Sequence, residues 1–142
     1  IEYLNIKNEN KVFYEYGRQE TKFVLIDWIK KIQDNGAGEI MLTSIDREGT
    51  GNGFDLDVLS EINKICKVPL TIHGGCSNFK DIKNLVLNNK KSKVTGVALS
   101  SLLHYNFLRK EKKINFSISN KWEKTDIKII KKKLKKENIF VR

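Results

Sequence analysis

The apolar residues of this chain follow two alternating patterns, one with helical spacing and one of short continuous runs. Apolar positions recur every three or four residues, as on one face of an α-helix, over residues 24–32, 58–66, 79–86 and 127–137. Apolar and β-prone residues run together, as in strands, over residues 11–16, 39–46, 70–72 and 94–99. The alternation predicts an α/β fold with a parallel sheet, either open or closed into a barrel.

Local signals predict how several of these elements are packed or begin. The run at 39–46 has polar residues only towards its ends, which is typical of a strand buried on both faces. Asn78 and Asp81 have the spacing of a capping box at the start of a helix. Thr125 is the predicted cap of the last helix, and a short segment after residue 99 is predicted to end near Tyr105. The stretch between residues 109 and 122 shows little periodicity.

Candidate chemistry lies directly after the predicted strands. In parallel α/β sheets, active sites lie at the carboxyl ends of the strands. Three segments occupy these positions: Asp46-Arg47-Glu48-Gly49-Thr50-Gly51, His73-Gly74-Gly75-Cys76-Ser77 and Ser100-Ser101. Glycines let backbone N–H groups approach an anion, and the start of a helix offers amides and hydroxyls. The Gly74-Gly75 turn and the Ser100-Ser101 helix start, at consecutive strand ends, therefore predict a phosphate site.

Charge and hydropathy narrow the class of protein only slightly. The 142 residues carry 27 Lys and Arg against 17 Asp and Glu, a formal net charge of +10. Few of the basic residues are Arg, the side chain best suited to bidentate phosphate and base recognition. The densest basic run, at 131–136, has helical spacing, and a solvated helix face is favoured over nucleic-acid binding. No stretch approaches the roughly 18 apolar residues of a membrane span.

The cysteines and histidines do not predict a metal centre. Cys66 and Cys76 are too few for a disulfide framework and are expected to stay thiols in a reducing cytoplasm. His73 and Cys76 form at most half a metal site, because Cys66 and His104 fall on other segments, so we expect no metal and no cofactor. His73 is otherwise a proton carrier, a substrate donor or a neutral imidazole whose hydrogen bonds are satisfied. The chain opens at Ile1 without a Met, which suggests a fragment.

A series of motifs in a fixed order spans nearly the whole chain. They are Gly36-Ala37-Gly38-Glu39-Ile40, Leu42-Thr43-Ser44-Ile45-Asp46-Arg47-Glu48-Gly49-Thr50, Gly53-Phe54-Asp55, Pro69, Gly74-Gly75 and the ending from Leu134 to Arg142. Their order resembles the cyclase subunit of imidazole glycerol phosphate synthase, a (βα)8 TIM barrel of histidine biosynthesis. The resemblance implies that residues 1–142 form a single domain, the C-terminal half of such a barrel. A strand end and hairpin would occupy 1–23, and three βα units would occupy 24–142.

The resemblance also implies roles for individual residues. The implied catalytic acids are Glu2, Asp46 and Glu48; the implied phosphate ligands are Gly49, Gly74, Gly75, Ser100 and Ser101; Thr43, Thr50 and His73 line the implied pocket. Glu2 falls where the family has its second catalytic Asp when the spacing to Trp28 is kept. Glu39 stands in the place of an ammonia-gate residue. For Asp46, a structural loop acid that accepts backbone N–H bonds is an equal alternative.

The implied activity closes the imidazole ring of a phosphoribulosyl-formimino substrate with ammonia from a separate glutaminase subunit. The first half of the barrel would carry the first catalytic Asp, so we expect this chain alone to be inactive. Glu48, His73 and Cys76-Ser77 depart from the family pattern and favour, as an alternative, a paralogue that amidinates a sugar nucleotide for surface polysaccharide or flagellin glycans. A non-catalytic half-barrel binding protein is a further alternative.

A half barrel also has consequences for assembly. It leaves sheet edges unpaired and one apolar face uncovered. The expected partner for that surface is the other half of the barrel or a second copy of the chain, and aggregation is the expected outcome without either.

Overall fold

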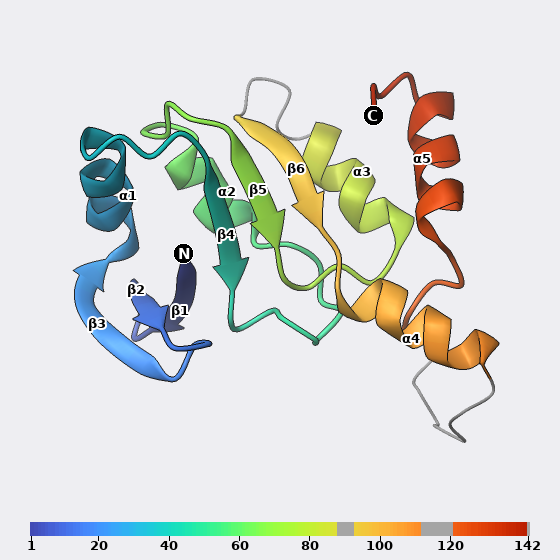
Figure 1. The fold of residues 1–142 in the computed structure, drawn as a ribbon, viewed down its shortest axis with the longest axis horizontal. Coiled ribbons are helices and arrows are strands. Elements are labelled where there is room, and N and C mark those ends of the chain that lie inside the picture. Colours follow the sequence, from blue (N-terminus) through green and yellow to red (C-terminus); the bar gives the residue numbers. More distant parts are fainter. Residues whose placement is uncertain (88–92, 112–120, 142) are drawn as a thin grey trace.

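The computed structural model describes residues 1–87, 93–111 and 121–141 of the chain (Figure 1). Within these ranges the strands are β1 (Glu2–Ile6), β2 (Glu9–Tyr14), β3 (Gln19–Val24), β4 (Ile40–Ser44), β5 (Leu70–His73) and β6 (Val94–Ala98). The helices are α1 (Leu25–Asp34), α2 (Leu56–Ile62), α3 (Phe79–Leu87), α4 (Ser101–Lys110) and α5 (Ile127–Lys136). None of these helices combines the length and the hydropathy that crossing a membrane requires.

One sheet joins an antiparallel meander to a parallel half, in the order β3-β2-β1-β4-β5-β6. β1, β2 and β3 pair antiparallel, whereas β1 with β4, β4 with β5 and β5 with β6 pair parallel. The arrowheads of β4, β5 and β6 point to the same edge in Figure 1, where α4 begins. The predicted fold class, parallel strands alternating with helices, is confirmed. The predicted post-strand segments therefore leave the sheet side by side.

The register of the sheet aligns candidate residues in one row. Glu2 pairs with Thr43, Thr43 with His73, and His73 with Ala98. Because side chains at paired positions of neighbouring strands point to the same face, this row lies on one face of the sheet. The structure thus brings three predicted site residues into adjacent positions on three different strands.

Burial differs sharply between the two faces of the sheet. Ile40, Leu42 and Ser44 of β4 are buried, whereas Met41 between them is 46% exposed. The prediction that this strand is buried on both faces is wrong, because the helices that cover it lie on one side. Figure 1 shows α2 behind β4 and β5. The open face also carries Thr43 and the other polar residues of the row, so it is mixed in polarity and not a uniformly apolar interior.

The helix starts confirm one predicted cap and correct another. The Asp81 N–H donates to Asn78 Oδ1 at 3.0 Å and the Asn78 N–H donates to Asp81 Oδ2 at 3.3 Å, so the capping box of α3 is confirmed. Thr125 does not cap α5. Asp126, in extended conformation directly before the first helical residue, accepts the Ile129 N–H at 2.9 Å, while Thr125 is buried.

The helix after β6 is longer than predicted. α4 continues to Lys110 and does not end near Tyr105. Its buried face includes Asn106, whose amide donates to the carbonyl oxygens of Leu102 and Glu123, each at 2.7 Å. Apolar periodicity does not register a buried Asn, so the pattern breaks off before the helix ends. Most of the poorly periodic stretch that follows lies outside the described residues.

Candidate functional site

A small pocket lies at the carboxyl edge of the parallel strands, where the loops after β4 and β5 meet the start of α4. Seven predicted site residues line it: Glu48, Gly49, His73, Gly74, Gly75, Ser100 and Ser101. Cys76 and Trp122 also contribute to its wall. The structure therefore brings together residues that the sequence placed on a common rim.

The Gly74-Gly75 turn forms one side of this pocket and can be made only by glycine. Both residues have positive φ, +102° and +96°. A Cβ on Gly75 would lie 2.1 Å from the Gly53 carbonyl oxygen, and one on Gly74 would lie 2.7 Å from that of Ser44. The Gly53 N–H donates to the Gly75 carbonyl oxygen at 2.8 Å. Direct backbone contact thus joins the loop after β5 to the loop after β4.

Residues with unused hydrogen-bond donors line this pocket. Within the described parts of the chain, neither the Ser100 nor the Ser101 hydroxyl is hydrogen-bonded, and the Gly75 N–H has no acceptor. Gly49 lies close to the Ser101 hydroxyl, because a Cβ built on Gly49 would be 4.0 Å from Ser101 Oγ. The first turn of α4 adds its free backbone N–H groups and the positive end of its dipole. This combination is suited to binding an anion.

His73 and Glu48 pair within the wall of the pocket. His73 Nδ1 lies 3.0 Å from Glu48 Oε2 and 3.3 Å from Thr43 Oγ1. The His73 side chain is 16% exposed and that of Glu48 is 38% exposed. The contact is a hydrogen bond when the imidazole is neutral and an ion pair when it is protonated.

Cys76 is an inert part of the wall. Burial, reinforced by the nearby Asp81 carboxylate, raises the pKa of its thiol to about 12, so the thiol stays protonated near neutral pH. Its sulfur donates to the Asn78 carbonyl oxygen at 3.6 Å. Cys66 is likewise free and buried, so the prediction of two thiols is confirmed. The described ranges contain no group of three or more His, Cys, Asp or Glu residues placed to hold a metal ion.

Two of the predicted acids accept hydrogen bonds from backbone N–H groups and do not line this pocket. Glu2 Oε2 accepts the Gly17 N–H at 2.8 Å, at the tip of the β2–β3 hairpin. Asp46 Oδ2 accepts the Asn5 N–H at 2.8 Å, which is the contact expected of a structural loop acid. Asp46 thereby ties the loop after β4 to β1.

Thr50 and Glu39 also lie outside the pocket. The Thr50 hydroxyl donates to the Arg47 carbonyl oxygen at 2.7 Å and so stabilises the loop after β4. Glu39 precedes β4 and accepts the Thr71 hydroxyl at 3.0 Å. Glu39 therefore lies at the amino edge of the sheet, opposite the pocket.

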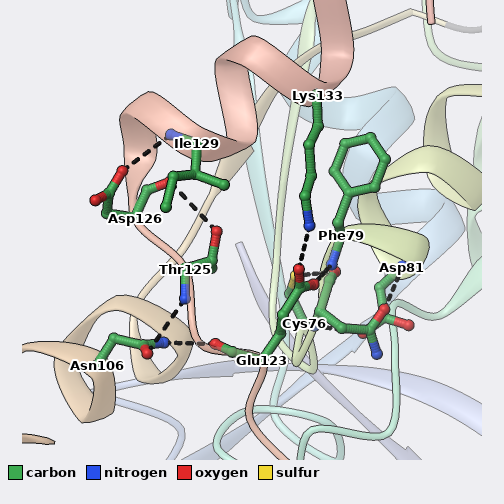
Figure 2. Close-up of polar contacts among 10 residues, drawn as sticks. Cys76, Phe79, Asp81, Asn106, Glu123, Thr125, Asp126, Ile129 and Lys133 are labelled. Atoms are coloured by element: carbon green, nitrogen blue, oxygen red, sulfur yellow. Dashed lines mark hydrogen bonds and ion pairs between the residues drawn. The ribbon is translucent and has the colours of Figure 1, made fainter. Parts of the chain in front are cut away.

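Trp122 is a wall residue that the sequence did not predict, because it follows the stretch without periodicity. It is 6% exposed and packs against Tyr105, with ring centroids 5.2 Å apart. The next residue, Glu123, holds this segment in place (Figure 2). Its N–H donates to the Ser77 carbonyl oxygen at 2.9 Å, and its carboxylate accepts the Phe79 N–H and pairs with Lys133.

The Glu123 carboxylate is stabilised in its charged form. Burial alone would raise its pKa, but the hydrogen bond from Lys133 and the Phe79 N–H outweigh burial, and the pKa is lowered. Lys133 belongs to the basic run of α5, whose other lysines at 131, 132, 135 and 136 are exposed. The run is therefore a solvated helix face from which one lysine reaches inward.

A second, more open pocket lies between α4 and the start of α5. It is lined by Asn106, Arg109, Lys110, Lys124, Thr125, Asp126 and Ile129. It lies apart from the predicted site residues, none of which lines it.

Comparisons with known proteins identify relatives of this chain. The family model described as histidine biosynthesis protein matches residues 3–109. Imidazole glycerol phosphate synthase subunit HisF of Prochlorococcus marinus is 36% identical over 117 residues, which are 82% of this chain and 44% of that protein. The putative subunit HisF of Leptospira borgpetersenii is 38% identical over 106 residues, 75% of this chain and 41% of that protein. The chain thus spans less than half the length of these relatives.

Replacing Gly75 with Ala should lower the free energy of unfolding by about 2 to 5 kcal/mol, the sum of positive-φ strain and a Cβ clash with backbone. Denaturant unfolding of both proteins measures the change. Gly38→Ala is the matched control, because Gly38 has no positive φ and open space around its Cβ. The control should change stability by no more than about 0.5 kcal/mol. Equal, small effects of the two substitutions would contradict the backbone contact.

Glu123→Gln should lower the free energy of unfolding at pH 7 by about 1 to 3 kcal/mol, because a charged acceptor of two hydrogen bonds is lost. A carboxyl group with a lowered folded pKa stabilises the protein fully above its ordinary pKa, 4.5, and less as the pH falls through the folded value. The difference between the variant and the wild type should therefore narrow below pH 4.5. Urea unfolding across this range measures it.

Glu61→Gln controls for the loss of a carboxylate as such, because Glu61 is an exposed residue of α2. The free energy of unfolding of this variant should depend on pH in the same way as that of the wild type. If the loss in free energy of unfolding caused by Glu123→Gln stays constant down to acidic pH, the charge of Glu123 does not stabilise the fold.

Proposed function

This chain belongs to the histidine biosynthesis protein family, and from that premise we propose that it forms the C-terminal half of an imidazole glycerol phosphate synthase cyclase subunit. As a single domain it would supply four of the barrel's strands, with the β2–β3 hairpin as an arm on the first of them. In this proposal the complete protein closes the imidazole ring of a phosphoribulosyl-formimino substrate. A glutaminase subunit supplies the ammonia.

The observation that carries the proposal is the anion-suited pocket at the carboxyl edge of the parallel strands. A substrate with a phosphate at its end needs a site of this kind beside the catalytic centre. The Gly75 N–H and the Ser100 and Ser101 hydroxyls supply donors without any bound partner in the described chain. Each charge-assisted hydrogen bond to phosphate contributes about 1.5 to 3 kcal/mol.

Proton transfer in this proposal falls to Glu2. It lies in the same row of the sheet as Thr43 and His73, and thus on the face that carries the pocket wall. One of its carboxylate oxygens accepts the Gly17 N–H, which orients the group and leaves the other oxygen for substrate. Asp46, whose carboxylate holds the Asn5 N–H, is assigned a positioning role in the loop.

Ammonia would enter from the opposite edge of the sheet. Glu39 lies there, ahead of β4, and its hydrogen bond with Thr71 places it beside the next strand. We assign to Glu39 a gate role at this edge, facing the glutaminase partner. Substrate and ammonia would then approach the row of Glu2, Thr43 and His73 from opposite ends of the strands.

A paralogue that amidinates a sugar nucleotide is the second candidate, and the His73–Glu48 pair favours it. The pair brings a carboxylate and an imidazole into the pocket wall. Glu48 and His73 both depart from the family pattern, and together they change the polarity of this wall. A substrate whose electrophilic carbon differs from that of the histidine-pathway substrate would account for this change. The non-catalytic binding alternative predicts phosphate binding without turnover of either substrate.

The proposal is tested by measuring turnover of the phosphoribulosyl-formimino substrate with ammonium salt. The assay uses the full-length natural protein. Product formation is expected. Glu2→Gln should lower kcat by about 100-fold or more, because a positioned acid–base group is lost. Ser101→Ala should raise KM about tenfold, because one phosphate hydrogen bond is lost.

Ser60→Ala, on the exposed face of α2, is the matched control and should leave both constants unchanged. A folded protein that converts a sugar nucleotide with ammonium salt, and not the histidine-pathway substrate, would contradict the first proposal and establish the second.

A further inference from the structure

Two ionisable side chains, Glu48 and His73, lie side by side in the pocket wall. Glu48 and His73 face each other there, and the third ionisable lining residue in the described chain, Cys76, keeps its proton because burial raises its pKa to about 12. The remaining lining residues carry no charge: Gly49, Gly74, Gly75, Ala98, Leu99, Ser100, Ser101 and Trp122. A lone carboxylate in this wall would repel an anion.

The geometry of the pair determines which imidazole nitrogen remains available. Nδ1 lies within 3.0 Å of Glu48 Oε2, so the carboxylate favours a proton on Nδ1. Thr43 Oγ1, at 3.3 Å from the same nitrogen, supports this orientation from β4. Among the described residues Nε2 has no hydrogen-bond partner. Protonation of the ring therefore adds a donor at Nε2 as well as a positive charge.

We propose that the His73–Glu48 pair makes the binding of phosphate esters in this pocket depend on pH. With His73 protonated, the pair is neutral overall and the imidazolium adds a charge-assisted hydrogen bond to the bound phosphate. With His73 neutral, the negative charge of Glu48 stands unbalanced beside the anion. The inference rests on the proposed phosphate site and adds to it a residue that sets its affinity.

The other charged side chains around the pair are engaged elsewhere. Arg47 pairs with Asp55, Lys121 donates to Asn52, Glu2 accepts the Gly17 N–H and Asp46 accepts the Asn5 N–H. The lining residues from β6 and α4, between 98 and 101, are uncharged. Histidine is the side chain whose charge ordinarily changes between about pH 5 and pH 8. His73 is the histidine among the residues that line this pocket.

Sulfate is a suitable probe, because it keeps its double negative charge over this range while phosphate does not. Isothermal titration of the purified protein with sulfate, between about pH 5.5 and pH 8.5, measures the dependence. The wild-type affinity should fall about tenfold as the pH rises, as one charge-assisted hydrogen bond is lost. His73→Asn should abolish this dependence. Glu48→Gln should raise the affinity at the alkaline end about tenfold, because it removes the repulsion.

His104→Asn is the matched control, because His104 is the other histidine of the chain and is exposed on α4. The sulfate affinity of this variant should depend on pH as that of the wild type does. Sulfate binding that Ser101→Ala weakens, but whose pH dependence His73→Asn and Glu48→Gln leave unchanged, would overturn the inference and leave the phosphate site intact. No sulfate binding by the folded protein at any pH would overturn the phosphate site, and the inference with it.

Discussion

The backbone crossing of the Gly74-Gly75 turn over Gly53 and Ser44 is the constraint on which the rest of the site depends. A side chain at either glycine would collide with a carbonyl oxygen, so the two loops can approach only while both positions lack a Cβ. That approach places Gly75 and the start of α4 in the wall of one pocket. It also sets the loop carrying Glu48 against the end of the strand carrying His73. The proposed anion binding and its proposed pH dependence therefore share one structural origin.

A second set of contacts holds the far wall of the pocket. Glu123 connects the segment after Trp122 to the start of α3 and, through Lys133, to α5. Asn106 connects the same segment to α4. A single half-buried carboxylate thus stabilises the Phe79 end of α3 and positions an aromatic wall residue. The wall of the pocket therefore depends on α5, a helix that contributes no residue to it.

Strong periodicity and local hydrogen bonding were predictable from the sequence, and features created by tertiary contact were not. The parallel strands, the α3 capping box and the convergence of the Gly74-Gly75 turn with Ser101 follow from spacing and from the rule that parallel strands end together. The exposed Met41 was missed because an apolar run carries no information about which face a neighbour covers. Trp122 was missed because its position depends on Glu123, which acts through residues distant in sequence.

The central claim is that an anion binds where the Gly75 N–H meets the start of α4. Backbone amide NMR during titration with a phosphate monoester tests it most directly. The account predicts that the largest shifts fall on Gly75, Ser101 and the residues next to them. Shifts confined to the basic pocket around Arg109 and Lys124 would contradict it, because they would place anion binding on surface charge outside the sheet edge.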